Sequence, residues 1–144
     1  MFIIWCPHKN TMLHQRITIV RYVRPQEQDV NSDLQWFGNA LGLFSLRDKD
    51  KSCFRMFITM LKGAKVHHAF SSDELAHHLN LSRATVIHHL NKLMEAGIVI
   101  QQGSRYILRV ETLSLLIDEI RKDLERSLLD LTQVAKEIDE ALDL

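Results

Sequence analysis

The sequence predicts a mainly α-helical protein with one small β-hairpin and a long C-terminal helix. Three observations support this fold class. Apolar residues recur at helical spacing through most of residues 32–96, and two short apolar stretches flank a glycine-containing turn at residues 101–104. From residue 111 onward the chain contains no glycine or proline, so nothing there interrupts a helix.

The chain has 144 residues, of which 46% are apolar, enough for one domain with an extension. Disorder throughout is therefore excluded. No apolar run approaches the roughly 20 residues of a membrane helix, and residues 1–6 lack the flanking features of a secretory signal. Neither Cys6 nor Cys53 belongs to a CxxC pair, which argues against a disulfide framework or a thiolate zinc site. We expect a cytoplasmic protein without a membrane segment.

The formal net charge is zero, but the charges are unevenly distributed. Residues 111–144 contain ten acidic and four basic residues, a net charge of −6, so residues 1–110 carry +6. A basic body with an acidic tail is typical of a protein whose body binds a polyanion. On charge alone, two merely solvated surfaces are an equally good interpretation.

Residues 1–31 are expected to form an N-terminal arm. Within it, residues 15–24 (QRITIVRYVR) are rich in β-branched and aromatic residues and predict a strand that ends before Pro25. The sequence leaves three arrangements open for that strand: it joins the hairpin of its own chain, pairs across a dimer, or stays loose. Residues 1–11 show no helical or strand period and are assigned no function.

Two helices are predicted between residues 32 and 63. Ser32 is the expected N-cap of a helix over residues 33–46, whose apolar residues recur at helical spacing: Leu34, Phe37, Leu41 and Phe44. The next helix carries Phe54, Phe57, Ile58 and Leu61 on one face, and Gly63 is expected to end it.

Two further helices follow in quick succession. Ser71 and Glu74 have the spacing of a capping box, so a helix is predicted over residues 72–79, ending at Asn80. Ser82 is the expected N-cap of a longer helix over residues 83–96. A short helix, a three-residue turn and a longer helix form the helix-turn-helix pattern.

A hairpin and a long helix complete the predicted chain. Residues 98–100 and 106–108 form the two strands around the turn. In the helix over residues 111–144, apolar residues alternate at four- and three-residue spacing, as in a helix that buries its stripe against a partner helix: Leu113, Ile117, Ile120, Leu124, Leu131, Val134, Ile138 and Ala141.

The residues DELAHHLNLSRATVIHHLNKLMEAGIVIQQGSRYIL (73–108) carry a resemblance to a known family. Through them the segment from about Asp50 to Arg109 resembles the winged helix-turn-helix domain of prokaryotic transcription regulators, especially the ArsR type and its archaeal relatives. The pattern Leu-Ser-x-x-Thr-Val-x-x-His-Leu-x-x-Leu-x-x-x-Gly over residues 81–97 is specific for that fold class. The resemblance covers about 60 residues. It implies a DNA-binding domain, here residues 32–109, which include the helix over residues 33–46, and it is consistent with dimerisation through residues 110–144.

The face of helix 83–96 opposite its apolar stripe suits a DNA major groove, because it is small and polar. On it Asn91 is suited to pair with adenine, Ile87 to contact a thymine methyl, and Arg83 and Lys92 to contact phosphates. The full set of candidate DNA-binding residues, with the hairpin tip at a minor groove, is Ser82, Arg83, Ala84, Thr85, Ile87, His88, Asn91, Lys92, Gln102 and Arg105.

A homodimer is expected because the helices predicted over residues 33–46 and 111–144 carry more apolar surface than a monomer would bury. Two recognition helices related by a twofold axis would then address an imperfect inverted repeat. The candidate interface residues are Trp36, Phe37, Leu41, Leu113, Ile117, Ile120, Leu124, Leu131, Val134 and Ile138.

Three histidine pairs occur, and they raise the alternative of a metal-responsive repressor. ArsR-type metal sensors carry a cysteine motif on the first helix of the helix-turn-helix or carboxylate and histidine ligands on the last helix. Here residues 74–77 contain no cysteine and residues 111–144 no histidine, so no metal site is assigned and no cofactor is expected. The ligands worth testing are His67, His68, His77 and His78.

Enzymatic chemistry has little support, because the chain has no glycine-rich phosphate loop, no HExxH motif and no nucleophile in a recognisable setting. Cys53 is expected to pack as a small apolar residue. The sequence therefore predicts a non-enzymatic, homodimeric DNA-binding regulator. A winged helix that binds another protein instead of DNA is the alternative, because helix 83–96 carries only two basic residues and one acid.

Overall fold

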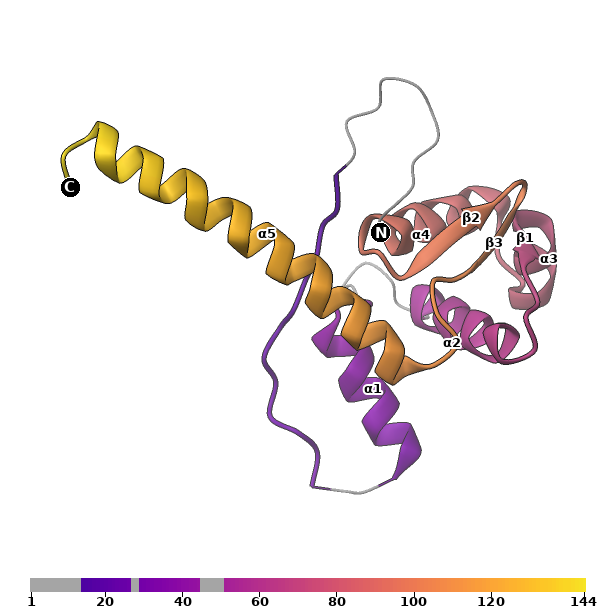
Figure 1. The fold of residues 1–144 in the computed structure, drawn as a ribbon. Helices are drawn as coiled ribbons and strands as arrows, with labels where there is room; N and C mark the ends of the chain where they lie inside the picture. Colours follow the sequence, from indigo (N-terminus) through magenta and orange to yellow (C-terminus); the bar gives the residue numbers. More distant parts are fainter. Residues whose placement is uncertain (1–13, 27–28, 45–50) are drawn as a thin grey trace.

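The computed structural model describes residues 14–26, 29–44 and 51–144 (Figure 1). These residues form five helices and a three-stranded antiparallel sheet, in the order α1 (Val30–Ala40), α2 (Ser52–Lys65), β1 (Phe70–Ser71), α3 (Ser72–Leu79), α4 (Arg83–Glu95), β2 (Val99–Gln102), β3 (Arg105–Leu108) and α5 (Leu113–Ala141). The strand order is β1-β3-β2, so β3 lies in the middle. The predicted fold class, mainly helical with a small β-hairpin and a long C-terminal helix, is confirmed.

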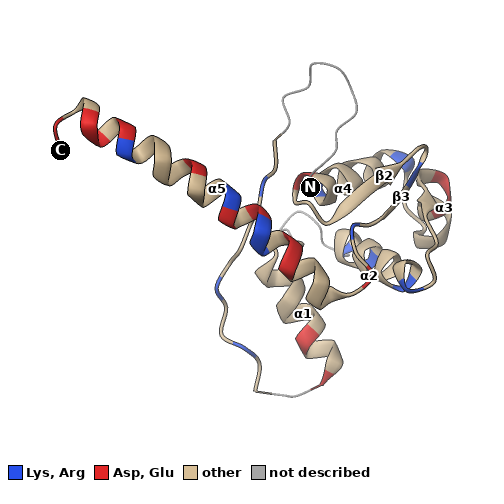
Figure 2. Ribbon diagram, viewed as in Figure 1, with Lys and Arg blue, Asp and Glu red and all other residues tan. Residues whose placement is uncertain are grey.

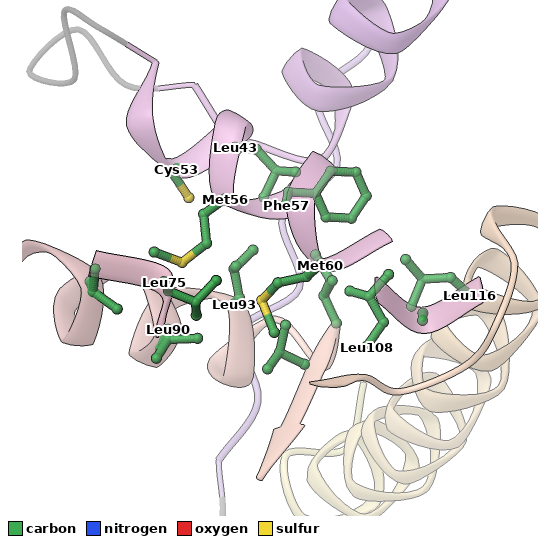
Figure 3. Close-up of a cluster of buried hydrophobic side chains, with 14 of the residues drawn as sticks. Leu43, Cys53, Met56, Phe57, Met60, Leu75, Leu90, Leu93, Leu108 and Leu116 are labelled. Atoms are coloured by element: carbon green, nitrogen blue, oxygen red, sulfur yellow. The ribbon is translucent and has the colours of Figure 1, made fainter. Parts of the chain in front are cut away.

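The core lies where α2, α3, α4 and the sheet meet. Met56, Phe57 and Met60 of α2 are completely buried, and they lie close to the leucines of the helix-turn-helix (Figure 3). The first turns of α5 add Leu116 and Ile120 to the same cluster. Burial of this apolar surface is the main term that stabilises the body.

The two helices of the helix-turn-helix are as predicted. Ser71 accepts from the amide of Glu74, and Glu74 returns a bond to the amide of Ser71, which completes the capping box. Asn80 ends α3 in the left-handed conformation, at φ 56°. Ser82 is the N-cap of α4. Local rules were sufficient here because the capping residues Ser71, Asn80 and Ser82 bond to residues within four positions of themselves.

Helix α1 differs from the predicted range of 33–46. Asp29, not Ser32, is its N-cap, because the Asp29 carboxylate accepts from the Ser32 amide at 2.8 Å and from the Ser32 hydroxyl at 2.9 Å. The helix ends after Ala40, since Gly42 adopts φ +70°. Residues 45 and 46 of the predicted range lie outside the described residues.

Gly63 does not end α2 as predicted. The helix continues to Lys65, and Gly63 is buried beside the ring of Phe70. Phe70 belongs to β1, a two-residue strand that was not predicted, which pairs with β3 through Phe70–Tyr106 and Ser71–Arg105. The glycine thus permits a close approach of the sheet to α2 rather than a helix end.

The predicted strand over residues 15–24 is wrong. These residues are extended, but they are not a strand of the described sheet. Single backbone bonds hold them to helices instead: the Arg16 amide donates to the Glu95 carbonyl, and the Val20 amide donates to the Ala40 carbonyl, both at 2.8 Å. The β-branched composition therefore gives an extended arm that lies along the helices.

Helix α5 leaves the body after its first turns and projects far beyond it (Figure 1). Its N-cap is Thr112, whose hydroxyl accepts from the amide of Leu115 at 3.2 Å. Among the helices of the described ranges, none is long and apolar enough to cross a membrane.

Candidate nucleic-acid interface

Helix α4 presents one small, polar face to solvent. Ala84, His88 and Asn91 are exposed on it, as the helical period predicts, while Val86, Leu90 and Leu93 are buried. Lys92 is half-buried at the edge of the face. A shallow, open hollow lies on this face, and its lining consists of predicted site residues: Arg83, Ala84, Ile87, His88 and Asn91.

Two of the predicted DNA-binding residues also shape the start of α4. The Ser82 hydroxyl accepts from the amide of Thr85 at 3.1 Å and lies 2.8 Å from the Thr85 hydroxyl. These bonds satisfy part of the first turn of the helix. Ser82 and Thr85 therefore stabilise the first turn of α4 through bonds to each other.

Arg83 lies at the start of the same face and is mostly exposed. Its guanidinium is 3.8 Å from the carboxylate of Asp73 on α3, and both side chains are more than 70% exposed. Such a contact is weak in water, so Arg83 remains available to a phosphate.

The hairpin tip is open on one side and anchored on the other. Gln102 is exposed and faces Arg105 across the two strands. Arg105 donates to the Ala69 carbonyl at 3.0 Å and forms an ion pair with Glu74 of α3. The predicted minor-groove arginine therefore has partners within its own chain.

Glu74 connects three parts of the domain. Besides Ser71 and Arg105, it binds the ring of His68, with 3.0 Å between Nε2 and the carboxylate. The bond from the Ser71 amide, and then those from His68 and Arg105, lower the pKa of Glu74 to about 2. This carboxylate holds the start of α3, the chain before β1 and the hairpin in one arrangement.

The histidines serve several separate contacts. His67 lies 3.4 Å from Glu111, and His77 and His78 are exposed on α3. Within the described part of the chain, no group of three or more histidine, cysteine or acidic side chains is close enough to hold a metal ion. His89 is 7% exposed, and its Nε2 lies 2.6 Å from the hydroxyl of Ser52.

The predicted dimer residues fall into four groups by burial. Ile120 is only 4% exposed and lies in the protomer's own core, so it leaves little surface for a partner. Phe37, Leu41 and Leu113 are half-buried against that core, and Trp36 donates to the Tyr22 carbonyl at 3.2 Å. Ile117 and Leu124 are partly exposed, and the remaining three are at least half exposed on distal α5: Leu131, Val134 and Ile138.

Charges on α5 are mixed. Figure 2 shows basic and acidic residues alternating over its middle and acidic residues predominating toward the C-terminus. In the first half these charges pair within the helix, as between Arg121 and Asp118 at 2.9 Å. The acidic end lies far from α4 in the same view.

Two residues that support this surface were not singled out from the sequence. Arg55 of α2 donates to the Leu79 carbonyl at 2.8 Å, which holds the end of α3 before the turn. Gln15 of the arm donates to the Ala96 carbonyl just after α4. No local motif identifies either one, because their partners are 24 and 81 positions away.

Residues 71–101 match the family model described as "Bacterial regulatory protein, arsR family". The match begins at the N-cap of α3 and ends within β2, so it contains both helices of the helix-turn-helix. The resemblance stated from the sequence is confirmed over these residues. No curated protein and no solved structure matched the chain.

Proposed function

Because this chain carries the helix-turn-helix of ArsR-type transcription regulators, a DNA-binding element, we propose that it binds its operator as a homodimer and without enzymatic activity. The two copies of α4 enter successive major grooves, and the hairpins lie over the neighbouring minor grooves. The operator is then an imperfect inverted repeat. The observation that carries this proposal is the solvent-exposed face of α4, with Ala84, His88 and Asn91 open on it, within the residues that match the arsR family model.

The chemistry of that face suits base edges. Asn91 offers an amide that matches the donor and acceptor of adenine, and Ile87 offers a methyl surface to thymine. Arg83 and Lys92 flank these residues, where phosphates would lie. Between these flanking residues, Ala84 and His88 add no long charged side chain, so the middle of the helix can approach the bases closely.

Dimerisation through α5 is supported by its exposed apolar residues. Leu131, Val134 and Ile138 are 64%, 51% and 50% exposed in the protomer, and they recur at the spacing of a helix-pairing stripe. A partner helix that covers them would remove apolar surface from water.

Fluorescence anisotropy with a labelled duplex from the region upstream of the gene, compared with random duplex over a range of salt, tests the proposal. We expect Asn91→Ala to weaken specific binding about tenfold and to relax the preference at one base pair. Arg83→Ala should weaken binding to all sequences and reduce the salt slope by about 1.

Two control variants distinguish these effects from a general loss of structure. Asn39→Ala on α1 and Arg121→Ala on α5 remove the same side chains from exposed positions distant from α4. Both should bind DNA like the native protein. A native protein that binds neither duplex would overturn the proposal.

A protein-binding role for the winged helix is the second candidate. It is favoured by the ion pair of Arg105 with Glu74, which reduces the positive charge that the hairpin offers to DNA. Binding to both duplexes that is weak and nearly independent of salt would favour this candidate, since phosphate contacts make affinity depend steeply on salt.

A further inference from the structure

A polar cluster joins three distant parts of the chain around Asp123 of α5. Asp123 is only 7% exposed. Its carboxylate accepts two bonds from Arg109, at 2.6 and 3.2 Å, one from Gln15 at 2.9 Å and one from Arg126 at 2.6 Å. Arg109 follows the hairpin and also contacts Glu119 at 3.3 Å.

Gln15 links this cluster to the end of α4. Its side-chain nitrogen donates to Asp123 on α5 and to the carbonyl of Ala96, directly after α4, at 3.3 Å. An amide group has two hydrogens on this nitrogen, so both bonds can form at once. One side chain of the arm therefore spans from the recognition helix to the long helix.

The neighbouring arm residues contact the same end of α4. The Arg16 amide donates to the Glu95 carbonyl at 2.8 Å, and the His14 ring lies 3.5 Å from the Glu95 carboxylate. Gly97 adopts φ +78°, and a side chain there would overlap the amide of Gln15. The turn after α4 thus leaves the space that Gln15 occupies.

The pKa of Asp123 is lowered by its place in the cluster, so this carboxylate is charged near neutral pH. Burial alone would raise the pKa of Asp123, but the bonds from Arg109, Gln15 and Arg126 outweigh it and hold the pKa below 3.8. Hydrogen bonds to a charged carboxylate are short and directional. They therefore fix an angle between two helices better than sliding apolar contacts do.

We infer that Gln15, together with Asp123 and Arg109, acts as a brace that sets the orientation of α4 relative to α5. This inference rests on the proposed function, in which α5 forms the dimer contact and α4 reads DNA. The orientation within each protomer then sets the separation of the two recognition helices. These three are positioning residues, and the property they determine is the spacing of the two operator half-sites.

The first test measures the brace without DNA. Spin labels are attached at Ala84→Cys on α4 and Glu125→Cys on α5 of the full chain, with Cys6→Ser. Cys53 is retained because it is 1% exposed. Labelled chains are diluted with unlabelled protein so that pulsed electron-electron distance measurements report one protomer.

We compare the native background with Gln15→Ala and with Gln26→Ala, a glutamine of the same exposed arm. The distance distribution should be narrow in the native and Gln26→Ala proteins and at least twice as broad in Gln15→Ala. Asp123→Asn, which places donor hydrogens toward Arg109, should broaden it as well. Equal widths in Gln15→Ala and Gln26→Ala would overturn the inference, whether or not the protein binds DNA.

The second test uses duplexes that carry two half-sites at graded separations. We expect the native and Gln26→Ala proteins to prefer one separation about tenfold over the others. Gln15→Ala should lose most of that preference while binding a single half-site with native affinity. An unchanged preference in Gln15→Ala would overturn the brace alone, whereas absence of DNA binding by the native protein would overturn the proposed function.

Discussion

Glu74 shows how much a single side chain contributes at the residue scale. Its carboxylate accepts from the Ser71 amide at 3.2 Å, binds His68 and forms the ion pair with Arg105. The same residue thus caps α3 and determines where the wing arginine points. In the free protein Arg105 is directed toward β1 and α3, not toward a DNA backbone.

Glu74→Gln should strengthen DNA binding a few-fold and make the salt slope steeper by about 1. Glutamine retains the capping box, while the lost charge releases Arg105 to contact DNA. Salt-dependent anisotropy measures both quantities, and Glu125→Gln on α5 is the control. Weaker binding by Glu74→Gln would mean that Arg105 serves the wing only as a structural anchor.

Acid should destabilise the protein between about pH 4.5 and 2. The folded pKa of Glu74, about 2, lies below its ordinary value of 4.5, so its stabilisation is complete above pH 4.5 and is lost as the pH falls toward 2. Urea midpoints from circular dichroism at pH 6, 5, 4 and 3 measure this loss. The loss should be smaller in Glu74→Gln, and an equal loss in both proteins would contradict the assignment.

At the scale of elements, the sequence predicted those whose ends are fixed locally. The capping box at Ser71, the left-handed Asn80 and the N-cap Ser82 define α3 and α4. The exposed face of α4 also follows from its period alone, so Ala84, His88 and Asn91 were placed on it correctly.

The elements that were missed depend on contacts between distant residues. Strand β1 exists because Phe70 and Ser71 pair with β3, about 35 positions later, and two residues carry no period of their own. The arm has strand-forming composition, but its bonds go to helices. The partners of Arg105 and Gln15 are likewise far away in the sequence, so no local motif indicates them. For this reason the sequence did not predict the ion pair of Arg105 with Glu74.

Gly63→Ala should destabilise the protein, although alanine in a helix interior is about 1 kcal/mol more stable than glycine. A methyl group at Gly63 would overlap the ring of Phe70 and lie 3.1 Å from the carbonyl oxygen of His68. We expect a net loss of about 1–2 kcal/mol in the free energy of unfolding, measured by urea denaturation. Lys62→Ala, at an exposed position of the same helix, should be nearly neutral; a stabilised Gly63→Ala would show that β1 moves away easily.

At the scale of the whole molecule, distal α5 leaves a series of large apolar side chains exposed in the protomer, among them Leu131, Val134 and Ile138. Leu131→Asp with Val134→Asp should convert the proposed dimer to a monomer at micromolar concentration, because the charges would be buried in the contact. Light scattering after gel filtration measures the mass. The thermal midpoint of the body should change little, since both residues are exposed in the protomer.

The control for that variant is Leu129→Asp with Gln133→Asp, which makes the same kind of change on the other side of α5. Leu129 is 71% exposed and lies outside the predicted stripe. The control protein should remain dimeric. If it becomes monomeric while the first variant does not, the contact uses the opposite face of the helix.

The projecting part of α5 is long enough to convert a small rotation at its docked end into a large displacement at its far end. From Leu124 to Ala141 the helix extends about 26 Å beyond the residues that dock it, at about 1.5 Å per residue. A rotation of 10° at the docked end therefore displaces the far end by about 4–5 Å, more than the rise between adjacent base pairs of about 3.4 Å. A small change in packing around Leu116 is thus amplified into a displacement of the size on which DNA register depends.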